Sequence, residues 1–112
     1  MELTVVLKAI SDETRMKIIR LLLEHDYCVR GLAKRLNISE SAVSQHVKVL
    51  KELDILIGNK RGYYIHYEVD RLMLHAIAKE LEQLANIKSE GCNVVSEKTC
   101  KNERCQCQLK KS

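Results

Sequence analysis

The apolar positions near the start of the chain repeat with the spacing of one helical face. They fall at i, i+3, i+4 and i+7, at Leu3, Val6, Leu7 and Ile10. This spacing predicts a short amphipathic helix. The stretch SDET follows, and we expect Ser11 to cap a second helix whose first turn carries acids, where the helix dipole favours them. This helix should end near His25 or Asp26 and bury Met16, Ile19, Leu22 and Leu23.

A tight turn separates the next two predicted helices. VRGLAKRLNI predicts a helix that ends around Asn37, a residue type that adopts the left-handed conformation at helix ends. Ser39 is expected to cap the helix ESAVSQHVKVLKELDI. The break at residues 37–40 has the spacing of a helix-turn-helix. Seven apolar positions should lock the two helices together: Leu32, Ala33, Leu36, Ile38, Val43, Val47 and Leu50.

After these helices the period of the pattern changes. ILIGNKRGYYIHYEV contains two β-prone runs on either side of residues 58–62, which predicts a hairpin with those five residues in a mobile turn. Asp70 is expected to cap a last helix that ends near Lys88 and carries Met73, Ile77, Leu81 and Leu84 as its apolar stripe. Periodicity is lost beyond Gly91. We therefore expect a mostly α domain with a small β-hairpin over residues 1–88, followed by a flexible, cysteine-rich basic tail over residues 89–112.

Composition limits the class of protein. The chain has 112 residues, no Pro, Trp or Phe and only four Gly, which indicates one small helical domain with an aliphatic core. A domain of this size is marginally stable alone, so dimerisation would help it. It has neither a signal-peptide pattern nor an apolar run of about 20 residues, and it has five cysteines. These features favour a cytoplasmic protein with reduced thiols and no membrane partner.

Positive charge gathers in the middle of the chain. Residues 30–66 carry seven bases against three acids, which is typical of a protein that binds a polyanion. At about 100° per residue, the helix after the tight turn points its apolar residues inward and Ser41, Ser44, Gln45 and Lys48 outward. Hydroxyl, amide and ammonium groups suit a helix that enters the major groove of double-stranded DNA. An ordinary solvated helix face is the alternative interpretation.

Other residues would support this DNA contact. His46, at the edge of the buried face, is expected to be a hydrogen-bonded packing residue or to touch a phosphate. Lys60 and Arg61, at the expected hairpin tip, would contact phosphates or the minor groove, the alternative being a solvated turn. The complete set of candidate DNA-binding residues is Ser39, Ser41, Ser44, Gln45, His46, Lys48, Lys60 and Arg61.

Three segments together resemble one family. LKAISDETRMKIIRLLL, GLAKRLNISESAVSQHVKVLKELDIL and RGYYIHYEV are similar to the ArsR/SmtB group of winged-helix repressors, over roughly Leu3 to Leu84. The resemblance implies a winged helix-turn-helix that forms a homodimer through its first and last helices. It also implies binding to a palindromic operator near the protein's own promoter, and release when a metal or metalloid binds. Some members of the group sense redox state or other signals instead.

The sensing residues of the family are only partly present. One family site has a Cys-Val-Cys pattern at the start of the helix before the tight turn, and here Cys28 matches the first thiol while Arg30 replaces the second. A second family site, on the last helix, requires Asp-x-His. Here Asp70 matches the Asp, but Leu72 stands at the position of the His. The only further ligand types near that position are His75, Glu80 and Glu82. A small core residue is the alternative interpretation for Cys28.

The C-terminal segment CNVVSEKTCKNERCQC therefore supplies the sensor candidates, Cys92, Cys100, Cys105 and Cys107, with Cys28 as an additional ligand candidate. The Cys105/Cys107 pair with Cys100 would give three thiolates, which suit As(III), Sb(III) or Cu(I). All four would make a tetrahedral zinc or cadmium site. We favour As(III) or Sb(III). A redox switch through a disulfide and incidental cysteines in a disordered tail are the alternatives.

The sequence thus predicts a DNA-binding repressor that responds to thiophilic ions. It contains no GxGxxG, Walker or nucleophile-elbow pattern, and Cys28 has no evident His and Asn or Asp partners, so we do not expect an enzyme. A redox-responsive repressor remains an alternative, as does a winged-helix protein that serves as an interaction module or metal buffer.

Overall fold

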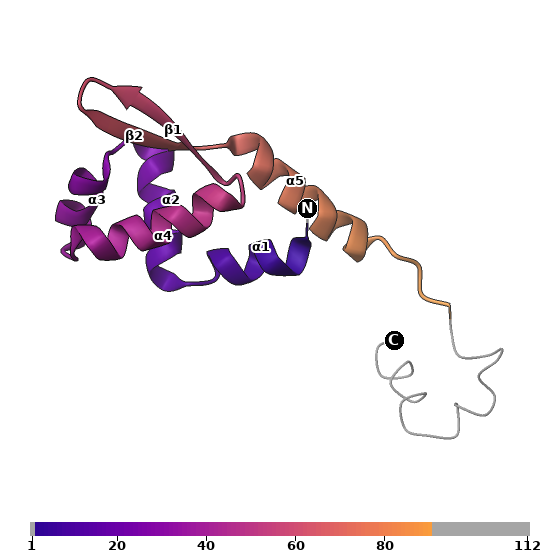
Figure 1. Cartoon of the computed structure of the whole chain (residues 1–112). Coiled ribbons are helices and arrows are strands. Elements are labelled where there is room, and N and C mark those ends of the chain that lie inside the picture. The colour runs from indigo at the N-terminus through magenta and orange to yellow at the C-terminus, as the bar shows by residue number, and fades with distance from the viewer. Residues whose placement is uncertain (1, 91–112) are drawn as a thin grey trace. The chain divides into compact units, whose positions relative to one another are not determined.

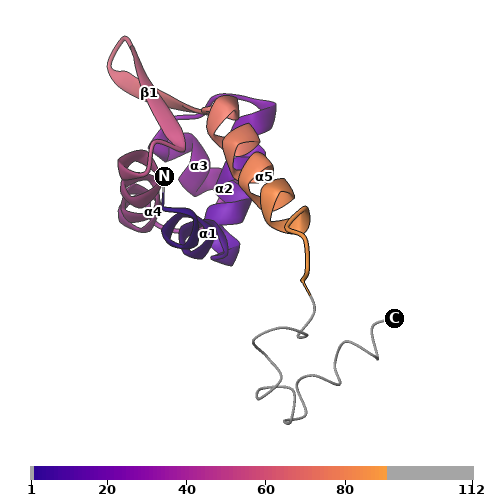
Figure 2. The ribbon, with the colours of Figure 1, turned by 90° about the vertical axis from the view of Figure 1, so that its right-hand side faces the viewer.

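The computed structural model describes residues 2–90, which form five helices and one antiparallel hairpin (Figure 1). The elements are α1 (Leu3–Ile10), α2 (Glu13–Glu24), α3 (Val29–Leu36), α4 (Glu40–Glu52), β1 (Leu56–Arg61), β2 (Tyr64–Val69) and α5 (Arg71–Ala85). The expected order of helices and hairpin is confirmed. The hairpin projects beyond the helices in two perpendicular views (Figures 1 and 2).

The core is built from aliphatic side chains of every element. Its fully buried members are Ile18, Leu32, Val43, Leu50 and Ile55. The predicted contact between α3 and α4 is confirmed, because Leu32, Ala33, Val43, Val47 and Leu50 are buried and Leu36 and Ile38 pack against the same cluster. Close packing of these residues fixes α4 to the rest of the domain and leaves its opposite side exposed.

The helix ends follow the local sequence, with one correction. Asn37 has φ 57° and ψ 47°, the expected left-handed conformation, and the Ser39 hydroxyl accepts from the backbone N–H of Ala42 at 3.0 Å. The cap of α2 is Asp12, whose carboxylate accepts from the N–H of Arg15 at 3.0 Å. The expected cap, Ser11, ends α1 instead, because its N–H bonds to the carbonyl of Leu7.

The turn of the hairpin lies further along the chain than predicted. Residues 58–61 belong to β1, and the turn consists of Gly62 and Tyr63, with Gly62 at φ 69°. A glycine with positive φ at the first central position is typical of two-residue hairpin turns. Gly58 pairs with Tyr67 inside the ladder, and a Cβ there would lie 3.2 Å from the Tyr67 ring. Gly58 therefore marks a close approach within the sheet, which the sequence pattern did not distinguish from a turn.

The last helix begins as predicted, since the carboxylate of Asp70 accepts from the N–H of Leu72 at 3.1 Å. It ends at Ala85, slightly before the expected Lys88. Of its predicted apolar stripe, Ile77 is buried and Met73 packs against the core, whereas Leu81 and Leu84 are 44% and 55% exposed. Residues 2–82 form one compact unit. No helix within residues 2–90 is long and apolar enough to cross a membrane.

Candidate nucleic-acid interface

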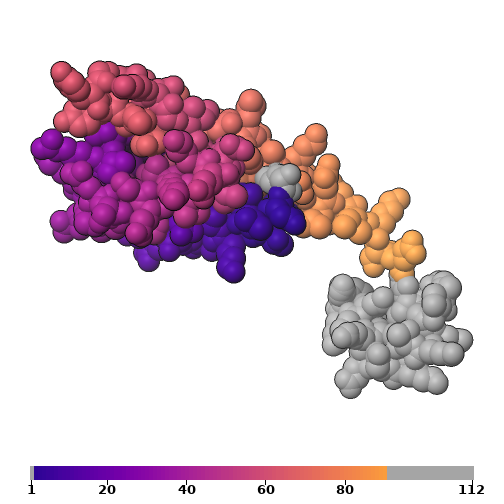
Figure 3. Space-filling model, viewed as in Figure 1, coloured from indigo at the N-terminus to yellow at the C-terminus, as the bar shows by residue number. Residues whose placement is uncertain are grey.

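Helix α4 presents a polar face to solvent. Its inward residues Val43, Val47 and Leu50 are at most 3% exposed. The residues predicted to point outward are all exposed: Ser41, Ser44, Gln45 and Lys48. In the space-filling view of Figure 3, α4 lies on the visible face between the hairpin and α1. The described structure thus brings these four candidates together on one accessible helix face.

Ser39, also a candidate for DNA contact, has a structural function at the start of α4. Its hydroxyl oxygen caps the helix and lies 3.3 Å from the hydroxyl of Ser41. Because only the acceptor capacity of Ser39 is used by the cap, one of these two hydroxyls can still donate outward. The N-terminus of α4 therefore combines a helix dipole with hydroxyl donors, an arrangement that favours anions such as phosphate.

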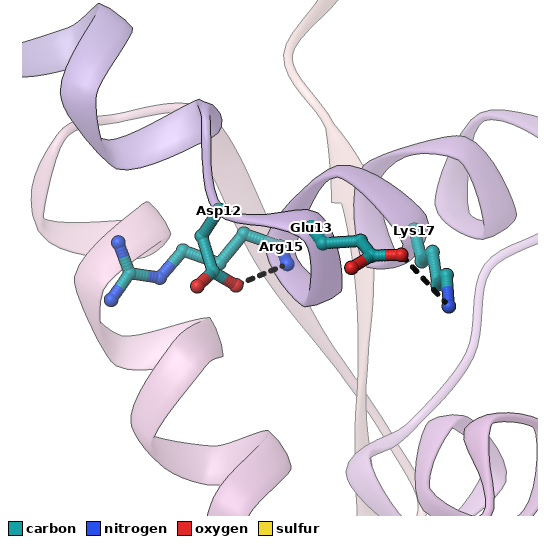
Figure 4. A network of polar contacts seen from close by, with 4 residues as sticks. All are labelled: Asp12, Glu13, Arg15 and Lys17. Atoms are coloured by element: carbon teal, nitrogen blue, oxygen red, sulfur yellow. Dashed lines mark hydrogen bonds and ion pairs between the residues drawn. The ribbon is translucent and has the colours of Figure 1, made fainter.

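His46 is half-buried and hydrogen-bonded within the protein. Its Nδ1 accepts from Nε of Arg15, at 3.1 Å, and Arg15 also donates through Nη1 to the carbonyl of Ala9 at 3.2 Å. The expectation of a hydrogen-bonded packing histidine is confirmed, although sequence reasoning missed its partner. Figure 4 shows the Arg15 side chain extending from the first turn of α2, beside the Asp12 cap.

The same cap perturbs the acid at the start of α2. The backbone N–H of Arg15 donates to Asp12 and holds the pKa of that carboxyl below its ordinary value of 3.8, although partial desolvation opposes the shift. The proximity of His46 and Arg15 lowers this pKa further. The lowered pKa favours the ionised carboxylate, which accepts the capping hydrogen bond at the junction between α1, α2 and α4.

The hairpin carries Lys60 and Arg61 near its tip, and both are exposed. Lys60 lies in β1 opposite Ile65. Arg61 forms an ion pair with Asp26, which follows the end of α2. The sequence did not predict this partner. It also did not predict that Tyr63 lies in the turn itself, where it is 98% exposed. Arg61 thus anchors the hairpin to the helical part of the domain in addition to lying near its tip.

The basic residues of the central segment all lie at the surface. Their side chains are exposed on α3, α4 and β1: Arg30, Lys34, Arg35, Lys48, Lys51, Lys60 and Arg61. Nearby acids are fewer, and one of them, Glu40, is in the first turn of α4. Exposed cations on adjacent elements are the electrostatic arrangement that attracts the phosphate backbone.

Cys28 is a half-buried free thiol at the N-terminal end of α3. It lines a hollow of about 360 Å³ with side chains that include Arg30, Tyr63 and Tyr64. Within residues 2–90, no group of three or more His, Cys, Asp or Glu side chains could hold a metal ion. The other sensor candidates, Cys92, Cys100, Cys105 and Cys107, lie outside the described residues.

Two short helices joined at residues 37–39, followed by a projecting hairpin, define a winged helix-turn-helix, the fold of a large class of DNA-binding regulators. Residues 12–57 match the family model described as bacterial regulatory protein, arsR family. The chain is 36% identical to the transcriptional repressor SdpR of Bacillus subtilis, over 79% of this chain and 94% of SdpR. The protein therefore belongs to the ArsR family of transcriptional regulators.

Two further comparisons agree with this assignment. The chain is 29% identical to the arsenical resistance operon repressor of Staphylococcus xylosus, with 90% of each chain covered. Among solved structures, it resembles an ArsR-like transcriptional regulator from Rhodococcus sp. RHA1, with a TM-score of 0.71 and 33% identity. That match covers 75% of this chain and 79% of the Rhodococcus protein.

Proposed function

We propose that this protein is a homodimeric repressor that binds a palindromic operator and releases it when a thiophilic ion binds cysteine thiolates. The exposed polar face of α4 is the observation that carries the DNA-binding part. Gln45 and Ser44 read base edges in the major groove, while Lys48 contacts a base or a phosphate. Repression as the direction of control is supported by SdpR and by the arsenical resistance repressor, both of which are named as repressors.

The hairpin contacts the DNA backbone beside the major groove. Lys60 contributes a phosphate contact. Arg61 contributes a second one only when a phosphate replaces Asp26 as the partner of its guanidinium group. Such contacts position the protein without reading sequence. Because Lys60 is exposed and lies two residues before the turn, its ammonium group is available to a phosphate.

The dimer forms through α1 and α5. Val5 on α1 and Leu81 and Leu84 on α5 are 47%, 44% and 55% exposed, and a second protomer would bury them. Val6 and Ile77, on the apolar faces of the same two helices, are buried within the protomer and stabilise it instead. Two recognition helices about 34 Å apart would meet successive major grooves, which is why the operator should be palindromic.

The inducer site consists of Cys92, Cys100, Cys105 and Cys107, with As(III) or Sb(III) favoured and Zn, Cd or Cu(I) as alternatives. Their spacing in the sequence and the similarity to an arsenical resistance repressor support this proposal. Release requires that the ion bind the DNA-free form more tightly, with a coupling of about 1–3 kcal/mol. Cys28 is the competing site.

The test is DNA binding in the presence of thiophilic ions. The triple variant Cys100→Ser/Cys105→Ser/Cys107→Ser and the control Cys28→Ser are each titrated onto the DNA upstream of the coding sequence. Arsenite, antimonite, zinc and cadmium are then added in turn. The proposal expects both variants to bind DNA normally, while only the triple variant fails to dissociate with the ion that releases the wild type.

Each other outcome points elsewhere. If Cys28→Ser loses the response and the triple variant keeps it, sensing lies at the start of α3. A wild type that releases DNA on oxidation but not with any of these ions would be a redox regulator. If the wild type prefers no DNA sequence over another, the proposed DNA-reading function is wrong.

A further inference from the structure

The side chain of Arg15 joins three helices. Arg15 is in the first turn of α2, and its Nε donates to Nδ1 of His46 in the middle of α4. Its Nη1 donates to the carbonyl of Ala9, in the last turn of α1. Both bonds are partly buried. A guanidinium group is planar with its donors in a fixed fork, so two simultaneous bonds constrain the relative positions of α1 and α4.

The carbonyl of Ala9 has a physical reason to accept from Arg15. The last carbonyls of a helix have no partner within the helix, and Ala9 is among those of α1. A cation near a helix C-terminus is also favoured by the helix dipole. The start of α2 is held in turn by Asp12, which accepts from the backbone N–H of Arg15. The cap fixes the backbone from which the Arg15 side chain extends.

This hydrogen bond gives His46 a defined partner. An arginine can only donate, so Nδ1 of His46 is the acceptor of the bond. The bond is directional, whereas the apolar contacts of Val43, Val47 and Leu50 are not. Packing sets the depth of α4 in the domain, and the Arg15–His46 bond can fix its rotation about its own axis.

We infer that Arg15 and His46 are positioning residues that fix the orientation of α4, so that Ser44, Gln45 and Lys48 face the DNA. The inference rests on the proposed function, because it assumes that α4 reads the major groove. It differs from the sequence-based hypothesis that His46 itself touches DNA. Since Arg15 also holds Ala9, the same side chain ties the proposed dimerisation helix α1 to the reading helix.

Two substitutions of His46 separate positioning from direct contact. Asn places its carbonyl oxygen close to the position of Nδ1, so His46→Asn retains the acceptor for Arg15. Gln places its polar atoms near the position of Nε2, so His46→Gln removes that acceptor. Arg15→Lys has one ammonium group and cannot reproduce the fork that joins His46 to Ala9. Arg20→Lys, an exposed cation on the same helix, is the matched control.

The measurement is fluorescence anisotropy with two labelled duplexes. One is selected by the wild type from a randomised pool, and the other has random sequence of the same length. We expect His46→Gln and Arg15→Lys to lose about tenfold or more in affinity for the selected duplex, as when one base contact made by α4 is lost. Affinity for the random duplex should stay within about twofold, because phosphate contacts are unchanged. His46→Asn and Arg20→Lys should bind like the wild type.

The double variant Arg15→Lys/His46→Gln should be no weaker than the weaker single variant, because both remove the same bond. Thermal unfolding and sedimentation of each variant identify any loss of folding. If His46→Gln does not fold, His46→Asn and Arg15→Lys still decide the question. Equal losses for His46→Asn and His46→Gln with normal binding by Arg15→Lys would overturn the inference, because His46 would then act on DNA directly. A wild type that selects no sequence would instead refute the proposed function.

Discussion

Helix α4 and the β1–β2 hairpin both carry residues proposed to contact DNA, yet the protein holds them by different forces. Helix α4 is fixed by a buried apolar stripe, by its Ser39 cap and by the bond from Arg15 to His46. Towards its tip the hairpin relies on polar contacts at the surface, namely the ion pair of Arg61 with Asp26 and the bond from Asn59 to Glu68. Reading a sequence requires a rigid element, whereas contacting a phosphate tolerates adjustment.

The largest expected effect concerns the stability of the two regions. Leu50 on α4 is fully buried, so Leu50→Ala should lower the free energy of unfolding by about 2–5 kcal/mol. Ile57 on β1 is 43% exposed, and Ile57→Ala should lower it by about 1 kcal/mol or less. Urea unfolding measures both. Similar losses in the two variants would show that the hairpin is as firmly packed as α4.

The second effect concerns sequence discrimination. Gln45→Ala or Ser44→Ala should lower the affinity for the selected duplex by about 1–3 kcal/mol for each base that is no longer read. Binding to a random duplex should change little, since neither side chain is charged. Lys60→Ala on the hairpin should instead weaken both duplexes alike. Loss of discrimination in Lys60→Ala, with none in Gln45→Ala, would reverse the functions of the two regions.

A smaller effect distinguishes the two hairpin cations. Lys60→Ala should reduce the slope of log affinity against log salt by about 0.9 for each phosphate that the protein no longer neutralises. Arg61→Ala should reduce it less, because Arg61 already pairs with Asp26. Asp26→Asn, which frees Arg61, should raise DNA affinity. If Arg61→Ala flattens the slope more than Lys60→Ala does, then DNA displaces Asp26 completely.

The smallest effect is the pH dependence contributed by Asp12. Folding lowers the pKa of this carboxyl below its ordinary value of 3.8, chiefly through the N–H of Arg15. Its contribution to stability is therefore complete above that ordinary value and is lost as pH falls through the lowered pKa. Asp12→Asn keeps a capping oxygen but does not titrate. Thermal melts from about pH 5 to about pH 2 should show a smaller decline for Asp12→Asn than for the wild type.

Much of the fold and part of the candidate site could be predicted because the relevant signals are local. The periodicity of Val43, Val47 and Leu50 identified both the buried side of α4 and its exposed polar side. The caps at Ser39 and Asp70 depend on bonds to residues only two or three positions away. The cap of α2 was misplaced by one residue because Ser11 and Asp12 are adjacent and both are good capping residues.

The hairpin turn was misplaced for a different reason. The segment from Gly58 to Gly62 begins and ends with glycine, and a glycine marks either a turn or a close approach inside a strand. Gly58 lies against the ring of Tyr67, nine positions along the chain, and only the strand register reveals this contact. The assignment of Lys60 and Arg61 to the turn was wrong for the same reason, although both remain close to it.

The sequence by itself determined which segments are helices, which side of α4 is buried and that Lys48 points outward from it, because periodicity and capping act over a few residues. Only the tertiary structure decided which partners the polar side chains contact. Arg15 and His46 are 31 positions apart, and their bond depends on how α1, α2 and α4 pack. The pairing of Arg61 with Asp26 likewise depends on where the hairpin folds back over the helices. Such contacts are set by the packing of the whole core, which no local pattern encodes.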